Sequence, residues 1–142
     1  MLKLVFLTNK FYADHASCTE IEQKETRPYV RIQIVVDGVL WAIPLRSHIN
    51  HPHVIWTDKE NNCGIDFSKA VVVTEPGKYI SGTQPHIRPN EFKALKQIDE
   101  YRVAQKMLGY IKEYKKAKLE PKILRNKELL RYSTLQYFEK YI

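Results

Sequence analysis

Hydrophobic residues in the first half of the chain alternate with polar ones or form short runs, which is the pattern of β-strands. The segments are residues 2–7, 29–36, 39–45 and 70–74. The second and third predict a β-hairpin, because Asp37-Gly38 between them tolerates the positive φ of a two-residue turn. Pro44 lacks an amide donor and is expected to end or edge the second arm.

The segments between these strands carry other signals. Residues 16–24 predict a short helix, with Asp14 or Ser17 as its cap. Residues 56–63 are mostly polar and predict an exposed excursion. Pro76-Gly77 predicts a turn, and residues 79–89 predict an irregular segment.

From Asn90 onwards the apolar residues follow a helical period. Asn90 is expected to cap a helix with a break near residues 97–100. Its buried stripe would consist of Phe92, Leu95, Ile98, Arg102, Met107, Leu108, Ile111 and Tyr114.

Pro121 is expected to stop this region and to begin another helix, which runs to about Tyr132. Ser133 or Thr134 would cap a last helix. The apolar residues expected to be buried in these two helices are Ile123, Leu124, Leu129, Leu130, Leu135, Phe138 and Ile142. Strands followed by helices predict a single α+β domain over residues 1–142.

The chain is basic, with 23 lysines and arginines against 16 acidic residues and a formal net charge of +7. Such a charge favours a polyanionic partner, since cations gain affinity by displacing counterions from phosphates. A solvated basic surface without a partner is the simpler interpretation. The cations concentrate late in the chain among Tyr110, Tyr114 and Tyr132, and unpaired RNA bases stack on such rings. The RNA-binding candidates are Asn50, Arg88, Lys106, Lys112, Lys115, Lys116, Lys118, Lys122 and Arg125.

Two further features bear on location. No apolar run approaches the 18 residues of a membrane helix, and residues 1–8 lack a signal-peptide cleavage pattern. Cys18 and Cys63 fit no metal or redox spacing. We therefore expect a cytoplasmic protein with free thiols.

The candidate chemistry lies directly after the predicted hairpin. Arg46, Ser47, His48, Asn50, His51 and His53 fall within eight positions. A loop held by a rigid hairpin is a common place for catalysis. Histidine can act as acid or base near neutral pH, and arginine pairs with phosphate oxygens. The candidate catalytic residues are Arg27, Tyr29, Arg46, Ser47, His48, His51 and His53.

RNA cleavage without a metal requires a base for the 2'-hydroxyl, an acid for the 5'-oxygen and cations for the transition state. This loop contains those residue types. Each side chain also has a structural interpretation: a serine shapes turns, and a lone histidine is usually polar surface or hydrogen-bonded packing. For His51 and His53 a metal site would need a third ligand such as Asp58 or Asp66, and none stands at a recognised spacing, so we expect no cofactor.

Several segments match one pattern in order. A basic residue precedes an aromatic strand start, two strands flank a short turn, and the second ends in Pro-Leu before a serine loop: Arg27-Pro28-Tyr29, Asp37-Gly38, Pro44-Leu45 and Arg46-Ser47. Residues 64–70, Gly-Ile-Asp-Phe-Ser-Lys-Ala, and the helical second half also match. In these features the chain resembles the toxins of type III toxin–antitoxin systems, the ToxN and AbiQ family, and is closest to CptN. Many members continue Ser-Pro-Lys, where this chain has Ser47-His48-Ile49.

The resemblance implies a small, strongly bent, barrel-like antiparallel sheet, similar to MazF and Kid, packed with C-terminal helices. It also implies a metal-independent endoribonuclease toxin of phage defence that leaves a 2',3'-cyclic phosphate. Cellular RNA would be its substrate, and it would process a structured repeat RNA antitoxin that then inhibits it in a closed toxin–RNA assembly. The resemblance assigns site roles to Arg27, Tyr29, Arg46 and Ser47 only. The histidines are candidates by residue type and location.

Two other functions fit the same composition. One is a non-catalytic RNA-binding module with a basic face, which would show salt-dependent binding and no cleavage. The other is a DNA-binding regulator that uses the late helices. It is disfavoured because no helix-turn-helix spacing is evident.

Overall fold

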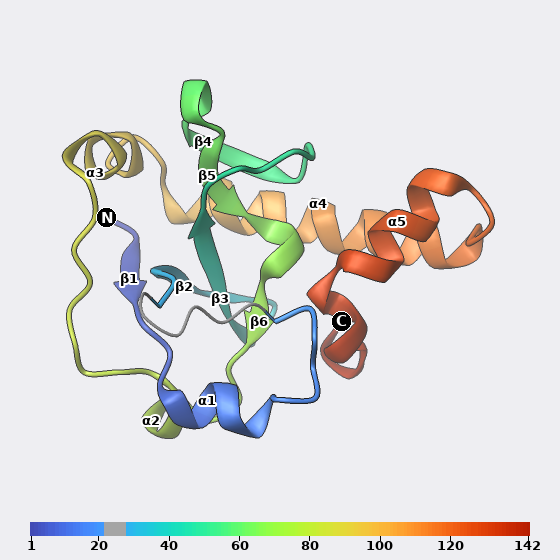
Figure 1. Ribbon diagram of the computed structural model, residues 1–142, viewed down its shortest axis with the longest axis horizontal. Coiled ribbons are helices and arrows are strands. Elements are labelled where there is room, and N and C mark those ends of the chain that lie inside the picture. The colour runs from blue at the N-terminus through green and yellow to red at the C-terminus, as the bar shows by residue number, and fades with distance from the viewer. Residues whose placement is uncertain (22–27) are drawn as a thin grey trace.

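The computed structural model describes residues 1–21 and 28–142 and has an α+β architecture (Figure 1). An antiparallel sheet lies beside a long helix, and shorter helices flank both. The strands are β1 (Lys3–Val5), β2 (Arg31–Val36), β3 (Val39–Arg46), β4 (Val54–Asp58), β5 (Cys63–Asp66) and β6 (Val71–Val72). The helices are α1 (Asn9–Asp14), α2 (Pro76–Tyr79), α3 (Pro89–Leu95), α4 (Glu100–Leu119) and α5 (Leu124–Tyr132).

The strand order is β1-β2-β3-β5-β4, and β6 pairs with β3. The predicted β2–β3 hairpin is confirmed, with Val36 opposite Val39. Its turn residues Asp37 and Gly38 have φ of 49° and 76°, which only short polar residues and glycine adopt readily. The α+β class is confirmed. The barrel-like shape is not confirmed, because β1 and β4, the two ends of the strand order, do not pair with each other in the described chain and so do not close the sheet.

Pro44 lies inside β3 and neither ends the strand nor lies on an outer edge. The Leu45 amide donates to Val30, 2.8 Å away, so the adjacent Pro44 nitrogen faces the opposite side of β3. On that side the β6 pairing stops at Ala42 and the β5 pairing begins at Leu45. Pro44, which has no amide donor, therefore lies where β3 changes its partner strand from β6 to β5. Its missing donor removes no hydrogen bond from the sheet.

The exposed excursion predicted at residues 56–63 is confirmed only for residues 59–62 and is wrong for the residues on either side of them. The segment belongs to a second hairpin, in which β4 and β5 flank a 3-10 turn at Lys59–Asn61, and only that turn and Asn62 are exposed. Gly64 permits the close pairing, because a Cβ there would lie 2.5 Å from the Ile55 carbonyl oxygen. β5 is buried on both faces, so its sequence lacks the alternation of a half-exposed strand.

The first helix also differs from its prediction. The chain forms α1 with Thr8 as its cap, whose hydroxyl accepts from the Phe11 amide. Residues 16–21 are turns and bends, and residues 22–24 of the predicted helix lie outside the described chain. α1 buries Phe11 and Tyr12 on adjacent positions, a pair too short to give a periodic pattern.

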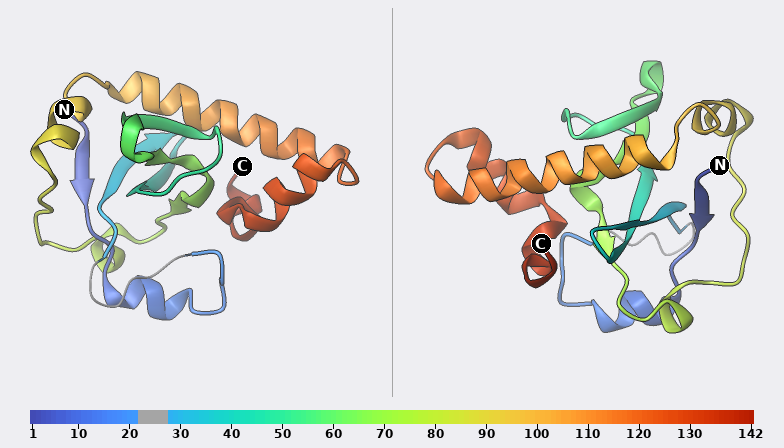
Figure 2. Two further views of the ribbon diagram at one scale, coloured as in Figure 1. Left: turned by 45° about the horizontal axis from the view of Figure 1, so that its top comes forward. Right: turned by 180° about the vertical axis from the view of Figure 1, so that it is seen from behind.

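The break predicted near residues 97–100 is confirmed, since α3 ends at Leu95 and α4 begins at Glu100 with Asp99 as its cap. Asn90 is not a cap, because it lies inside α3. Figure 2 shows α4 running across one side of the sheet, with α5 folded back beside its C-terminal half. α4 buries Val103, Met107, Tyr110, Ile111, Tyr114 and Ala117.

The end of the chain follows the predictions in part. α5 begins at Leu124 instead of Pro121, and Ile123 and Leu124 are 40% and 71% exposed, so their predicted burial is wrong. Ser133 caps a 3-10 turn, Thr134–Tyr137, and Leu135 and Phe138 are buried as expected. Within the described chain, α4 is the only helix of membrane-spanning length, and its charged residues rule it out as a span.

Candidate functional site

A cavity of about 940 Å³ opens where the loop after β3 faces α4 and α5. Its walls bring together segments that lie far apart in the sequence. Among the predicted site residues, those that line it are Arg46, Asn50, His51, His53, Lys116 and Arg125. Residues of the 46–53 segment therefore form one wall of the cavity, and residues of the late basic region form another wall of the same cavity.

Asp66, at the end of β5, lies behind this wall and has no exposed surface. One carboxylate oxygen accepts from the Ser68 amide at 2.9 Å and the Ser68 hydroxyl at 2.6 Å. The other accepts from Arg46 Nη1 at 2.6 Å. Burial would raise the pKa of Asp66, but the bonds from His51, Ser68 and Arg46 outweigh it and lower the pKa to about 2. Asp66 is therefore a buried anion at neutral pH.

His51 uses both ring nitrogens. Its Nδ1 accepts from the His53 amide at 3.1 Å, so in this bond Nδ1 carries no proton. Nε2 lies 3.0 Å from Asp66 Oδ1 and 3.1 Å from Ser68 Oγ, and it donates to them. In these hydrogen bonds Nε2 is the donor and Nδ1 is the acceptor.

His53 faces the cavity differently. Its ring lies 5.5 Å from the His51 ring and 5.0 Å from the Tyr110 ring. Burial lowers the pKa of His53 from 6.5, helped by His51 and Lys106 and opposed by Glu113 and Asp66. A lowered pKa keeps His53 neutral at pH 7, which is the form that can accept a proton.

Tyr110 supports His53 from α4. Its hydroxyl donates to Ser133 Oγ at 2.7 Å, which ties α4 to the start of the last turns. Burial raises the pKa of Tyr110, so the phenol stays protonated. The ring is therefore a fixed wall for the His53 imidazole.

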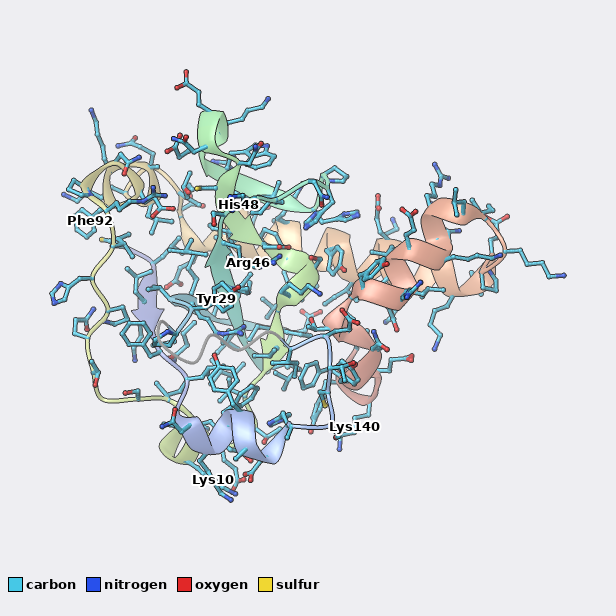
Figure 3. All side chains as sticks on the ribbon, in the orientation of Figure 1. Lys10, Tyr29, Arg46, His48, Phe92 and Lys140 are labelled. Atoms are coloured by element: carbon cyan, nitrogen blue, oxygen red, sulfur yellow. The ribbon has the colours of Figure 1, made fainter. Side chains whose placement is uncertain are left out.

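Arg46 reaches Asp66 because Arg46 on β3 pairs with Gly64, two residues before Asp66 on β5. Its guanidinium carbon also lies 6.0 Å from the centroid of the Tyr29 ring. In the view of Figure 3, Arg46 lies between Tyr29 and His48. Tyr29 is half-buried and does not line the cavity.

Ser47 and His48 are exposed and are not among the cavity residues. Ser47 Oγ and His48 Nδ1 lie 3.1 Å apart and bond to each other. His48 has a φ of 58°, in the left-handed region, which turns the chain away after β3. Arg27, the remaining candidate, lies outside the described residues.

The predicted RNA-binding residues spread over several surfaces. Lys112, Lys115 and Lys116 line a second groove of about 530 Å³ on the other side of α4. Arg88 instead bonds Glu91 and Cys63 beside α3, and Lys118 pairs with Glu139. Lys106 is exposed on α4, close enough to influence His53, and Lys122 is exposed between α4 and α5.

Sequence reasoning missed the roles of Asp66, Ser68 and Tyr110. Asp66 and Ser68 belong to the matching 64–70 segment, and Tyr110 belongs to the aromatic set. The sequence linked Asp66 to His51 and His53 only as a possible third metal ligand, and nothing in its spacing indicated that it would accept hydrogen bonds from His51 and Arg46. The cavity also contains the acidic residues Glu113, Glu120 and Glu128. In the described chain, no group of three histidine, cysteine or acidic side chains is arranged to hold a metal.

The comparisons with known proteins do not identify a relative. Searches against protein families, curated proteins and solved structures found no match for this chain. The functional argument therefore depends on the cavity, its charges and its histidines.

Proposed function

We propose that this protein is a metal-independent endoribonuclease, the toxin of a type III toxin–antitoxin system that its sequence resembles. The observation that carries the proposal is His53, a neutral, half-buried imidazole in a cavity that Arg46, Lys116 and Arg125 also line. The imidazole supplies a base, and the cations suit a phosphodiester.

In the proposed reaction His53 takes the proton of a ribose 2'-hydroxyl. The 2'-oxygen then forms a bond to phosphorus, and the bond from phosphorus to the 5'-oxygen breaks. The products are a 2',3'-cyclic phosphate and a 5'-hydroxyl, whose proton comes from a second donor or from water. Cations on the cavity wall would stabilise the extra negative charge on the phosphorane-like transition state.

The proposal includes the partners and the finer shape that the resemblance implies. A repeat RNA antitoxin would occupy the same cavity after processing, which would block substrate entry and give a closed toxin–RNA assembly. The sheet would belong to the bent, barrel-like type of MazF and Kid. Ser47 next to Arg46 and Tyr29 against the Arg46 guanidinium would contribute to phosphate binding at the edge of the site. The resemblance gives Arg27 the same phosphate-binding role.

The test uses protein freed of bound nucleic acid and a 5'-labelled, A-rich single-stranded RNA in EDTA, with the product ends mapped. We expect discrete cuts that end in cyclic phosphate and are lost in His53→Gln. His86→Gln is the matched control, because His86 is exposed in the loop before α3 and does not line the cavity. Absence of cleavage by the unmodified protein would refute the proposal.

A second candidate is a non-catalytic RNA-binding module. Lys112, Lys115 and Lys116 favour it, because they are exposed on one helix and form no ion pair with a described residue. Such a module would bind the same RNA tightly without cutting it, and its affinity would fall steeply with salt.

A further inference from the structure

We infer that His51 is a positioning residue that links buried Asp66 to the backbone of His53, and that His53 alone of the two exchanges protons with substrate. As far as it concerns cleavage, this inference rests on the proposed function. The two histidines are equivalent by residue type and sequence location, so the division of roles follows only from their contacts.

Both ring nitrogens of His51 are already hydrogen-bonded within the protein. Nδ1 is occupied by the His53 amide at 3.1 Å. Nε2 is occupied by Asp66 at 3.0 Å and Ser68 at 3.1 Å. To take a substrate proton on Nδ1, His51 would have to release the His53 amide.

The carboxylate that supports His51 is itself held in place. Asp66 is fully buried, and its side chain also accepts from the Ser68 amide that opens the 3-10 turn Phe67–Lys69. Arg46 holds the other carboxylate oxygen. Because Asp66 is fixed from three directions, the bond to Nε2 fixes the His51 ring as well.

His51 in turn sets the position of His53. Only Pro52, with its restricted φ, lies between them. The bond from the His53 amide to His51 Nδ1 closes this short turn, and the His53 ring then lies between the rings of His51 and Tyr110. The chain of contacts therefore runs from Asp66 through His51 to the His53 imidazole.

His53 has the properties that His51 lacks. Its ring nitrogens form no hydrogen bond with any residue in the described part of the chain, and the ring lines the cavity. The charged and titratable groups that act on it are His51 on its own loop, Asp66 on β5, and Lys106 and Glu113 on α4. His53 is thus the imidazole available to a substrate.

The test is a matched pair of variants. His51→Asn places an amide oxygen near the position of Nδ1, so it can still accept from the His53 amide, but it lacks Nε2, loses the bond to Asp66 and cannot titrate. His51→Ala removes the acceptor as well. We expect His51→Ala to lose at least about tenfold in RNA cleavage, as is usual when a group that orients a functional side chain is removed, and His51→Asn to lose clearly less.

The pH profile separates positioning from proton transfer. The acid limb of the cleavage rate should remain in His51→Asn and disappear from the residual activity of His53→Gln. Equal inactivity of the Asn and Ala variants, or loss of the acid limb in His51→Asn, would overturn the inference.

A measurement without RNA tests the same arrangement. ¹⁵N NMR of the imidazoles at neutral pH should place the His51 proton on Nε2. Nuclear Overhauser effects between the His53 and Tyr110 rings should persist in His51→Asn and disappear in His51→Ala. A His51 proton on Nδ1, or Overhauser effects unchanged in His51→Ala, would contradict the inference. If the unmodified protein cuts no RNA, the proposed function fails, whereas the NMR result still decides the role of His51.

Discussion

Ser47 and His48 begin the loop after β3, and His51 and His53 end it, yet the two pairs have different surroundings. Ser47 and His48 lie in solvent and bond each other. His51 and His53 are half-buried and contact Asp66 from β5 and Tyr110 from α4. The sequence supplies similar residue types to both ends of the loop.

The difference lies in what packs behind each pair. Behind His51 the buried carboxylate of Asp66 orients the ring, and behind His53 an aromatic wall lowers its exposure and its pKa. A side chain becomes useful for catalysis when such supports fix its position and its protonation state. The comparison therefore favours the inner pair as the centre of the site.

The largest expected effect tests this comparison directly. His53→Gln should lower the cleavage rate by about 10² to 10⁴-fold, which is the usual contribution of a general base. Ser47→Ala should cost about tenfold, because it removes one hydrogen bond to a charged phosphate. Single-turnover rates in EDTA measure both. A larger loss in Ser47→Ala than in His53→Gln would place the centre at the outer pair.

The next effect concerns the anchor of the inner pair. Since the pKa of Asp66 is lowered from 3.8 to about 2, its ionised form stabilises the fold above pH 4, and this contribution is lost as pH falls towards 2. The shift corresponds to roughly 2 kcal/mol of unfolding free energy. Asp66→Asn should therefore lower stability at pH 7 by at least about that amount and flatten its decline below pH 4, as measured by urea unfolding.

Asp37→Asn is the matched control for this substitution, because Asp37 is exposed in the β2–β3 turn and asparagine also adopts its positive φ. Asp37→Asn should leave the unfolding free energy at pH 7, and the decrease of that free energy below pH 4, nearly unchanged. Equal pH dependence in Asp66→Asn and in the unmodified protein would show that Asp66 is not the anchor described here.

A smaller effect compares the two sides of α4. Arg125→Ala removes a cation that lines only the cavity with the histidines, and Lys112→Ala removes one that lines only the other groove, whereas Lys116 lines both. Arg125→Ala should weaken binding of a single-stranded RNA more and reduce the salt slope by about 0.7 for the phosphate that is no longer neutralised. Fluorescence anisotropy over a salt series measures both. A stronger effect of Lys112→Ala would place the RNA on the other groove.

The smallest expected effect concerns Leu124, which the helical pattern predicted to be buried. Since it is 71% exposed, Leu124→Ser should change the unfolding free energy by less than about 0.5 kcal/mol. Leu135→Ala, at a residue with no exposed surface, should cost about 2–5 kcal/mol. A large destabilisation by Leu124→Ser would mean that this face of α5 is covered.

The elements predicted correctly depend on local chemistry. Asp37-Gly38 specifies the β2–β3 turn through backbone conformation, Ser133 caps a turn, and the break before α4 follows from the polar residues around Asp99. The missed elements depend on distant contacts. β5 has no alternation because other elements cover both of its faces, and Leu124 is exposed because α5 has no residue that is buried against the rest of the described chain.

The same division holds for the candidate site. By itself, the sequence determined an α+β chain with a basic late region and a histidine-rich loop at the end of a hairpin, because period, turn chemistry and charge are local properties. Only the tertiary structure decided that Asp66 holds His51 and Arg46, that His53 faces the cavity, and that Ser47 does not line it. The reason is physical: hydrogen bonds, burial and the pKa shifts they cause depend on which distant residues become neighbours, and sequence spacing does not encode that.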